Sequence, residues 1–404
     1  MPDGTYHYVV TAAYHSWTAT SGASDDVTVA GDSAAPAVTI AFPQDGAAYD
    51  AAGWSGGCPT TGLCGTASDP SGVAAVSLSV RQGTSGLYWG GSSFDQASET
   101  FVPATGTTSW ALGFARPPDG SYTVHARAAD TLGNTTPSGS YATSTFTVDT
   151  AAPTLSSLQL LDGDGNGKVD QVRATFSETL AASTATAPWT LANVPSGGSL
   201  ASVATAGTVA TLTLTEGAGA QDTAVGGFTA ALAANAAGIR DASANLSSLA
   251  ATAPADKAGP VVVGITSSGG VRGRMEAGDQ LAVTFSEPLL ASSVPSSATV
   301  SERDPSGSGN DVLSIGGITN SDRDTGSNGY VTGNNSTASF ASSTVALSAG
   351  TVTVTVGSTC AGGGCASVAA SQGVLSFAPA TGITDTAGNA AAGTFATASG
   401  FQLF

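Results

Sequence analysis

The sequence predicts an all-β protein made of antiparallel sandwiches repeated in tandem. Apolar residues at every second position, as in Val76–Val80 and Thr351–Val356, indicate strands with one buried face. Glycine, proline, asparagine and aspartate separate these runs, and several short strands per module favour two packed antiparallel sheets. The alanine-rich run 230–237 is the one stretch compatible with a helical turn.

Two motifs recur along the chain and divide it into modules. The linkers that open the modules are Asp32–Pro36, Asp149–Pro153 and Asp256–Pro260, and the Asp-x-x-[Gly/Ala]-Asn turns near their ends are Asp130–Asn134, Asp241–Asn245 and Asp385–Asn389. A repeat of about a hundred residues indicates one module copied in tandem, each copy with its own core. We therefore predict modules at 37–148, 153–255 and 260–404. The last is enlarged by an extended loop or extra hairpin within 304–339.

Residues 1–31 match the end of the first complete module. Pro2–Val10 aligns with Pro118–Ala126, which precedes that module's last two strands. We expect residues 1–31 to form the closing hairpin of an incomplete module, in an excerpt of a longer secreted protein. Because a lone hairpin is marginal in water, either a neighbouring chain completes it or it is a remnant of cutting.

The composition excludes some classes of partner. Charged residues make up 10% of the chain, against about 25% in typical globular proteins. Eleven basic and 29 acidic residues give a net charge of -18, so no basic surface neutralises phosphates, and we expect no nucleic-acid binding. The acidic balance suits contact with divalent cations, although solubility explains it equally well. No apolar stretch is long enough to span a bilayer.

The four cysteines form two local pairs, each in a glycine-rich stretch. Cys58 and Cys64 make one pair, and Cys360 and Cys365 make the other. Pairs this close reach disulfide geometry across a loop. Zinc is the alternative, but the pairs lie in different modules and the chain has only 3 histidines. Disulfides imply an oxidising location, outside the cell or at its surface.

Several motifs within 37–148 occur in a distinctive order. They are Trp54–Cys58, Cys64–Asp69, Val76–Arg81, Tyr88–Trp89 and Asp119–Tyr122. This set resembles the bacterial immunoglobulin-like modules found in tandem in surface and secreted proteins. Phe176–Glu178 and Phe285–Pro288 are similar to a second bacterial immunoglobulin-like class, seen in surface-layer and cell-wall proteins. The resemblance implies tandem immunoglobulin-like sandwiches in an elongated array, a fold that serves as stalk, spacer or adhesive tip.

An acidic loop in the second module predicts a structural calcium site. The oxygen ligands would come from Asp162, Asp164, Asn166, the Lys168 carbonyl and Asp170, with glycines permitting the tight turn. The loop matches the first nine positions of the calcium loops of the EF-hand and of dockerins. Arg173 stands where those loops carry a bidentate glutamate, so we expect weaker binding; a plain acidic turn is the alternative.

The third module should lack this site. Arg272 and Arg274 occupy the loop before Asp279, where the second module has carboxylates, and two arginines repel a cation.

Other acids have both structural and cation-binding interpretations. The aspartates of the Asp-x-x-[Gly/Ala]-Asn turns favour a tight turn, with a share in a cation site as the alternative. The linker acids Asp32, Asp149 and Asp256 are either caps or spacers, or calcium ligands that stiffen the junctions as in cadherin-like stalks. Glu178 and Glu287 either brace the turns or face solvent.

The aromatic residues predict mainly core packing. Tyr6 and Tyr122 match the tyrosine corner, in which the hydroxyl bonds back to the backbone. Tyr88 and Trp89 are adjacent on a predicted strand, so one of them should face outward. Exposed rings would be stacking platforms for sugars, and the remaining candidates are Trp17, Trp54, Trp110 and Trp189.

The sequence gives little support for catalysis, and we predict that the chain is not an enzyme. It has no His-Glu-x-x-His and no phosphate loop. We expect an extracellular structural or adhesive protein, a stalk or fibre that contacts neighbouring copies or other surface proteins. The alternative is a set of non-catalytic carbohydrate-binding modules of a larger secreted enzyme, with glycans as partners.

Overall fold

The chain is an all-β protein in the computed structural model, which describes residues 4–29, 31–305, 309–331, 333–365 and 370–404. Within those ranges, helical structure is limited to α1 (Ala51–Ser55) and the 3-10 turns η1 (Ser138–Ser140), η2 (Pro195–Gly197) and η3 (Ala291–Ser293). The contacts divide the chain into two compact units. One unit contains residues 1–151 with 243–245, and the other contains 152–242 with 246–404.

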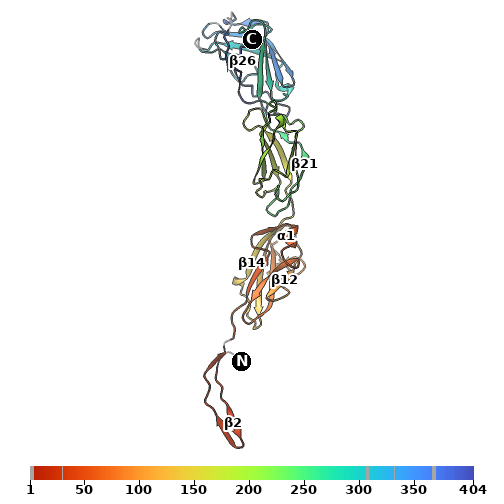
Figure 1. Cartoon of the computed structure of the whole chain (residues 1–404), viewed down its shortest axis with the longest axis vertical. Helices are drawn as coiled ribbons and strands as arrows, with labels where there is room; N and C mark the ends of the chain where they lie inside the picture. The colour runs from red at the N-terminus through yellow and green to blue at the C-terminus, as the bar shows by residue number, and fades with distance from the viewer. Residues whose placement is uncertain (1–3, 30, 306–308, 332, 366–369) are drawn as a thin grey trace. The chain divides into compact units, whose positions relative to one another are not determined.

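The N-terminal segment is a hairpin. Its strands are β1 (Gly4–Tyr6), β2 (Thr11–Tyr14), β3 (Trp17–Thr20) and β4 (Val27–Val29), with β1 paired to β4 and β2 to β3 (Figure 1, red). Gly4 lies opposite Val29, as Gly120 lies opposite Val148 in the last strand pair of segment 37–148. The two hairpins that align in sequence therefore share one register.

Segment 37–148 has two sheets around one core. Its strands are β5 (Ala37–Phe42), β6 (Ala47–Tyr49), β7 (Gly62–Ser68), β8 (Val73–Gln82), β9 (Tyr88–Trp89), β10 (Phe94–Gln96), β11 (Val102–Pro103), β12 (Ser109–Gly113), β13 (Gly120–Asp130) and β14 (Ala142–Val148). One sheet has the order β10-β9-β8-β13-β14-β6 with β11 on β8, and the other is β12-β7-β5. In Figure 1, β14 and β12 label one strand of each sheet.

The alternation predicted for β8 is confirmed. Val76, Leu78 and Val80 are buried in the core of this segment, whose largest members include Trp54 and Trp110. Most strand pairs are antiparallel, as predicted, but β6 runs parallel to β14. The apolar side chains that both sheets turn inward supply the main folding energy of the segment.

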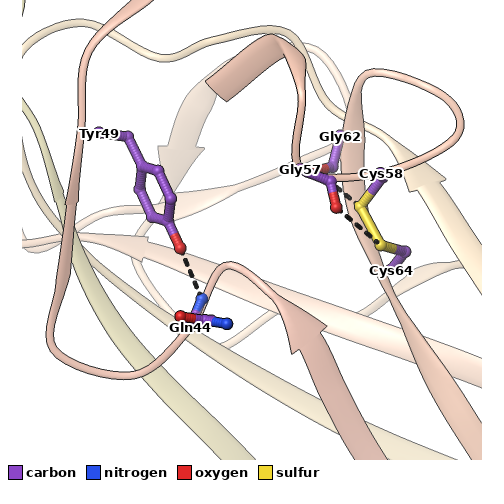
Figure 2. Close-up of a disulfide and its surroundings, with 6 residues drawn as sticks. All are labelled: Gln44, Tyr49, Gly57, Cys58, Gly62 and Cys64. Carbon is purple, nitrogen blue, oxygen red and sulfur yellow. Dashed lines mark hydrogen bonds between the residues drawn. A yellow bond between two sulfur atoms is a disulfide. The ribbon is translucent and has the colours of Figure 1, made fainter. Parts of the chain in front are cut away.

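A disulfide closes the loop between α1 and β7. Cys58 and Cys64 are bonded, with their Cα atoms 6.1 Å apart. Figure 2 shows that each sulfur contacts a backbone carbonyl oxygen. The sulfur of Cys58 lies 3.5 Å from the Gly62 oxygen, and the sulfur of Cys64 lies 3.9 Å from the Gly57 oxygen. The bond ties the short loop to β7, the central strand of the smaller sheet.

Segment 153–255 repeats the two-sheet plan. Its strands are β15 (Leu155–Leu161), β16 (Gln171–Phe176), β17 (Trp189–Ala192), β18 (Ser199–Ala206), β19 (Val209–Thr215), β20 (Thr229–Leu232), β21 (Leu249–Thr252) and β22 (Ala255–Asp256). The sheets are β18-β19-β16-β15-β22 and β17-β20-β21. The alanine-rich run 230–237 begins as strand β20 and forms no helix, because Ala230 and Leu232 alternate into the core between β17 and β21.

Segment 260–404 departs from that plan. Its strands are β23 (Val262–Ser268), β24 (Gln280–Phe285), β25 (Ser297–Arg303), β26 (Val312–Ile315), β27 (Arg323–Asp324), β28 (Thr337–Ser348), β29 (Thr351–Thr355), β30 (Thr359–Ala361), β31 (Ser376–Phe377) and β32 (Phe395–Ala396). Eight of them form one sheet, β23-β24-β29-β28-β25-β26-β27 with β30 on β28, and β31 pairs with β32. The predicted extra hairpin is β26–β27, which widens the large sheet, and a second disulfide joins Cys360 to Cys365.

Candidate functional sites

Each Asp-x-x-[Gly/Ala]-Asn turn holds the linker that opens its own module. Asn134 donates from Nδ2 to the carbonyl of Asp32 at 2.9 Å, and Thr136 donates from Oγ1 to the carbonyl of Pro36 at 3.1 Å. The next two modules repeat the contact. Ser247 donates from Oγ to the carbonyl of Pro153 at 2.7 Å, and the backbone N–H of Ala392 donates to the carbonyl of Pro260 at 3.1 Å. The linker motif and the turn motif, about a hundred residues apart in sequence, are thus two halves of one recurring hydrogen-bonded contact.

The turns themselves form as predicted. Asp130 accepts the backbone N–H groups of Leu132 and Asn134, at 2.9 and 2.8 Å, and Asp385 accepts that of Asn389 at 2.8 Å. The residue before the asparagine has a positive φ, 96° at Gly133, which explains the preference for glycine there. The predicted tight turn is confirmed for Asp130 and Asp385, and their share in a cation site stays a prediction.

Carboxylates gather at the first of these contacts. Asp32, Asp69 and Asp130 place one ligand atom each within 4.8 Å of the others. Oδ1 of Asp32 accepts the Ala34 N–H, while its Oδ2 is buried without a hydrogen-bond partner among the described residues. Burial opposes ionisation of Asp130, but hydrogen bonds, above all from Asn134, lower its pKa. The lowered pKa favours the charged form of Asp130, and Asp32 offers a buried oxygen that no described residue bonds.

A second cluster joins Asp256, Glu287 and Asp385, again within 4.8 Å. Glu287 is 5% exposed and accepts the hydroxyl of Thr223 at 2.6 Å, so it does not face solvent. Burial raises the pKa of Glu287 to about 8, and the charges of Asp256, Asp385 and Asp222 act in the same direction. Burial, with the charge of Asp385, raises the pKa of Asp256 to about 6.

These shifts identify a local excess of negative charge. Three carboxylates this close repel one another, and either a proton or a cation relieves the repulsion. The donor set is oxygen only, which suits a hard divalent cation such as calcium and not zinc held by sulfur or nitrogen. The spacing of these acids along the chain does not show that linker and turn converge, in the second cluster together with the Phe285–Glu287 segment.

The predicted calcium loop of the second module is tightly self-bonded. Asp162 accepts the N–H groups of Gly165 and Gly167, both at 2.8 Å, and Asp170 accepts that of Gly163 at 2.9 Å. Burial raises the pKa of Asp162, and the neighbouring Asp164 acts in the same direction. Asp164 and Asn166 are exposed, and the Lys168 ammonium donates to the carbonyl of Gly217 at 2.7 Å. Calcium binding by Asp162, Asp164, Asn166, Lys168 and Asp170 stays a prediction.

The corresponding acid of the third module is also bonded to its own loop. Asp279 is 1% exposed and accepts the N–H groups of Gly270, at 2.9 Å, and Glu276, at 2.6 Å.

The tryptophans divide between core and surface. Trp54, Trp110 and Trp189 are buried, as the core-packing interpretation predicts. Trp17 is the exception, since 79% of it is exposed on the N-terminal hairpin. The tyrosine-corner prediction is confirmed for Tyr122, whose hydroxyl donates to the carbonyl of Pro118 at 2.7 Å.

A pocket of about 410 Å³ lies beside Trp89. Half-buried Trp89 and Phe94 and buried Phe114 give it three aromatic walls, with Trp89 and Phe114 edge to face at 4.9 Å. Arg116 lies on its rim and pairs with Asp119 at 3.5 Å. Aromatic faces next to a charged hydrogen-bonding group suit a sugar ring.

Comparisons with known proteins give no family assignment. No family model and no curated protein match the chain. Among solved structures it is similar to SGBP-B of the mixed-linkage glucan utilization locus of Bacteroides ovatus, in complex with a heptasaccharide, at 11% identity and a TM-score of 0.16, covering 90% of this chain and 71% of that one. It is also similar to an α-L-rhamnosidase from Streptomyces avermitilis, at 12% identity and a TM-score of 0.18, covering 90% and 40%. TM-scores this low do not establish a shared fold. No helix in the described ranges is long and apolar enough to cross a membrane.

Proposed function

We propose that this chain is an extracellular scaffold protein built from tandem immunoglobulin-like modules. The observation that carries the proposal is the linker–turn contact, which recurs in each module and fastens the linker to the sandwich that follows it. A linker fastened by hydrogen bonds is less free than an open polar spacer. The separate hydrophobic cores and the two disulfides also support a secreted modular protein.

Calcium stiffens the linkers in this proposal. The support is the clustering of Asp32 with Asp69 and Asp130, and of Asp256 with Glu287 and Asp385, at the linker–turn contacts. Weak oxygen sites fill at the millimolar calcium of extracellular fluids. The ion would neutralise charges that otherwise repel one another across the linker.

Electron microscopy of the purified full chain, in calcium and in EDTA, tests the scaffold proposal. We expect rods that are straighter in calcium and more bent in EDTA. The matched variant Asp32→Asn keeps the size of the side chain but removes the charge, so it should weaken the response to calcium at its own linker only. Compact particles in both buffers would contradict the proposal.

Carbohydrate binding is the second candidate function, and the pocket beside Trp89 favours it. Binding of the chain to a glycan array should be lost in Trp89→Ala, which removes one aromatic wall. Trp17→Ala is the control, because that ring is exposed but lies outside the pocket. Binding that survives Trp89→Ala would exclude the pocket as the sugar site.

A neighbouring copy is the partner that we propose for the N-terminal hairpin. Tyr8, Val10, Tyr14 and Trp17 are between 55% and 79% exposed. Val124, which aligns with Tyr8, is buried in segment 37–148, so the hairpin presents residues of core type to solvent. Deleting residues 1–31 should abolish concentration-dependent assembly in sedimentation velocity. Assembly that persists would contradict this contact.

A further inference from the structure

Two acidic side chains lie inside the core of the last segment, away from the linkers. Glu302 on β25 and Asp311, just before β26, are each 0% exposed. Ala298, Val300 and Glu302 alternate on the buried side of β25. Glu302 therefore occupies a position that its neighbours on the strand fill with apolar side chains.

The register places both carboxylates on one face of the sheet. Glu302 lies directly opposite Leu313 in the antiparallel pair of β25 and β26. Asp311 precedes Leu313 by two residues and so projects from the same face as Glu302. Asp304, which is 7% exposed, follows Glu302 by two residues and completes an acidic end of the hairpin.

Three of the four carboxylate oxygens of Glu302 and Asp311 have no partner in the described part of the chain. Among the described residues, neither oxygen of Glu302 nor Oδ1 of Asp311 has a hydrogen bond. Oδ2 of Asp311 accepts the N–H groups of Gly329, at 2.9 Å, and Val331, at 3.1 Å, so loop 325–331 wraps around it. Natural cores rarely leave buried acceptors bare, and an unpaired buried carboxylate is strongly destabilising.

Within the part of the segment that the structure describes, neither Glu302 nor Asp311 forms an ion pair with a basic side chain. The neighbouring Arg303 turns to the other face and pairs with Asp322. Burial, followed by the charges of Asp311 and Asp279, raises the pKa of Glu302 to about 8. Tyr330 is 1% exposed, and its hydroxyl accepts the N–H of Leu403. Burial raises the pKa of Tyr330 to about 12, and both carboxylates add to the shift.

We propose that Glu302 and Asp311 bind a buried divalent cation of the calcium type. Two carboxylates and one divalent ion are electrically balanced, and the three bare oxygens are the start of the 6–8 oxygen ligands that calcium takes. A bidentate glutamate is a common calcium ligand, and the absence of histidine and thiolate from the pair disfavours zinc. This site belongs to the core of one module and is independent of the scaffold function and of the linker clusters.

Counting bound ions tests the proposal. The full chain is stripped with EDTA, reloaded with calcium chloride and examined by native mass spectrometry. Glu302→Gln and Asp311→Asn, which keep the shape of the side chains, should each hold one calcium fewer than the wild type. Glu287→Gln is the control, because any ion it loses belongs to the linker cluster. The same ion count in wild type and in both core variants would overturn the proposal.

A measurement on the wild type covers the case in which the variants fail to fold. Calcium should slow hydrogen exchange at the amides of Gly329 and Val331, which donate to Asp311. If Glu302 instead holds a proton, exchange at these amides is indifferent to calcium, and Glu302→Gln is as stable as the wild type in EDTA and in calcium alike. Either result overturns the cation site.

Discussion

Glu287→Gln should remove a defined part of the pH dependence of stability. Folding raises the pKa of Glu287 from 4.5 to about 8, so the folded chain holds this proton more tightly than the unfolded chain. Stability is therefore greatest below pH 4.5 and falls as pH rises through 8, where the buried carboxyl ionises. The glutamine stays neutral and still accepts the hydroxyl of Thr223.

The pH range that isolates the contribution of Glu287 to stability lies between pH 6 and 8. Asp256, with a pKa of about 6, contributes mainly below it. One pKa unit corresponds to about 1.4 kcal/mol, so across two units the wild type should lose up to about 2.7 kcal/mol more than the variant. Glu302, whose pKa is also about 8, contributes equally to both proteins and cancels in the difference.

Urea unfolding of the full chain in EDTA, followed by circular dichroism at several pH values, measures this difference. Added calcium should flatten the wild-type profile, because a cation bound at Asp256, Glu287 and Asp385 replaces the proton. Glu276→Gln is a suitable control, since that side chain is 34% exposed, pairs with Arg274 and lies outside the cluster. Equal slopes for wild type and Glu287→Gln between pH 6 and 8 would refute the reasoning.

The other predictions concern turn, disulfide and loop. Asn134→Ala removes the side-chain hydrogen bonds to Asp32 and Asp130 and should destabilise the first unit by about 1–3 kcal/mol in urea unfolding; an unchanged midpoint contradicts the contact. Replacing Cys58 and Cys64 by alanine should cost about 2 kcal/mol for so short a loop, and calorimetry that shows no loss would contradict it. Asp164→Ala should abolish any rise in the melting temperature of the second module with calcium; a melting curve that EDTA leaves unchanged in the wild type removes calcium from this loop.

The strands were predictable because their signal is local. Alternation in Val76–Val80 and Thr351–Val356 places strands β8 and β29, and the close cysteine pairs suggest both bridges. The parallel pairing of β6 with β14 was not predictable, because the two strands are about a hundred residues apart and nothing in either sequence specifies its neighbour.

The convergence of acidic residues at one site was likewise not predictable from the sequence. Asp32, Asp69 and Asp130 meet only after the sandwich has folded, so spacing along the chain gives no sign of their convergence. Glu302 is different, because it continues the buried period of Ala298 and Val300. Period two alone would have placed this carboxylate in the core, and the signal was lost among the polar residues that surround it.

The linker–turn contact has a consequence for how such chains grow. Each linker is bonded by residues of the sandwich that it precedes, as Pro36 is by Thr136 and Pro153 by Ser247. A gene duplication that begins at the linker aspartate therefore copies the joint together with the domain. Such a cassette can be inserted, deleted or exchanged while the joint keeps its own bonding partners, which makes variation in copy number the easiest evolutionary change for this architecture.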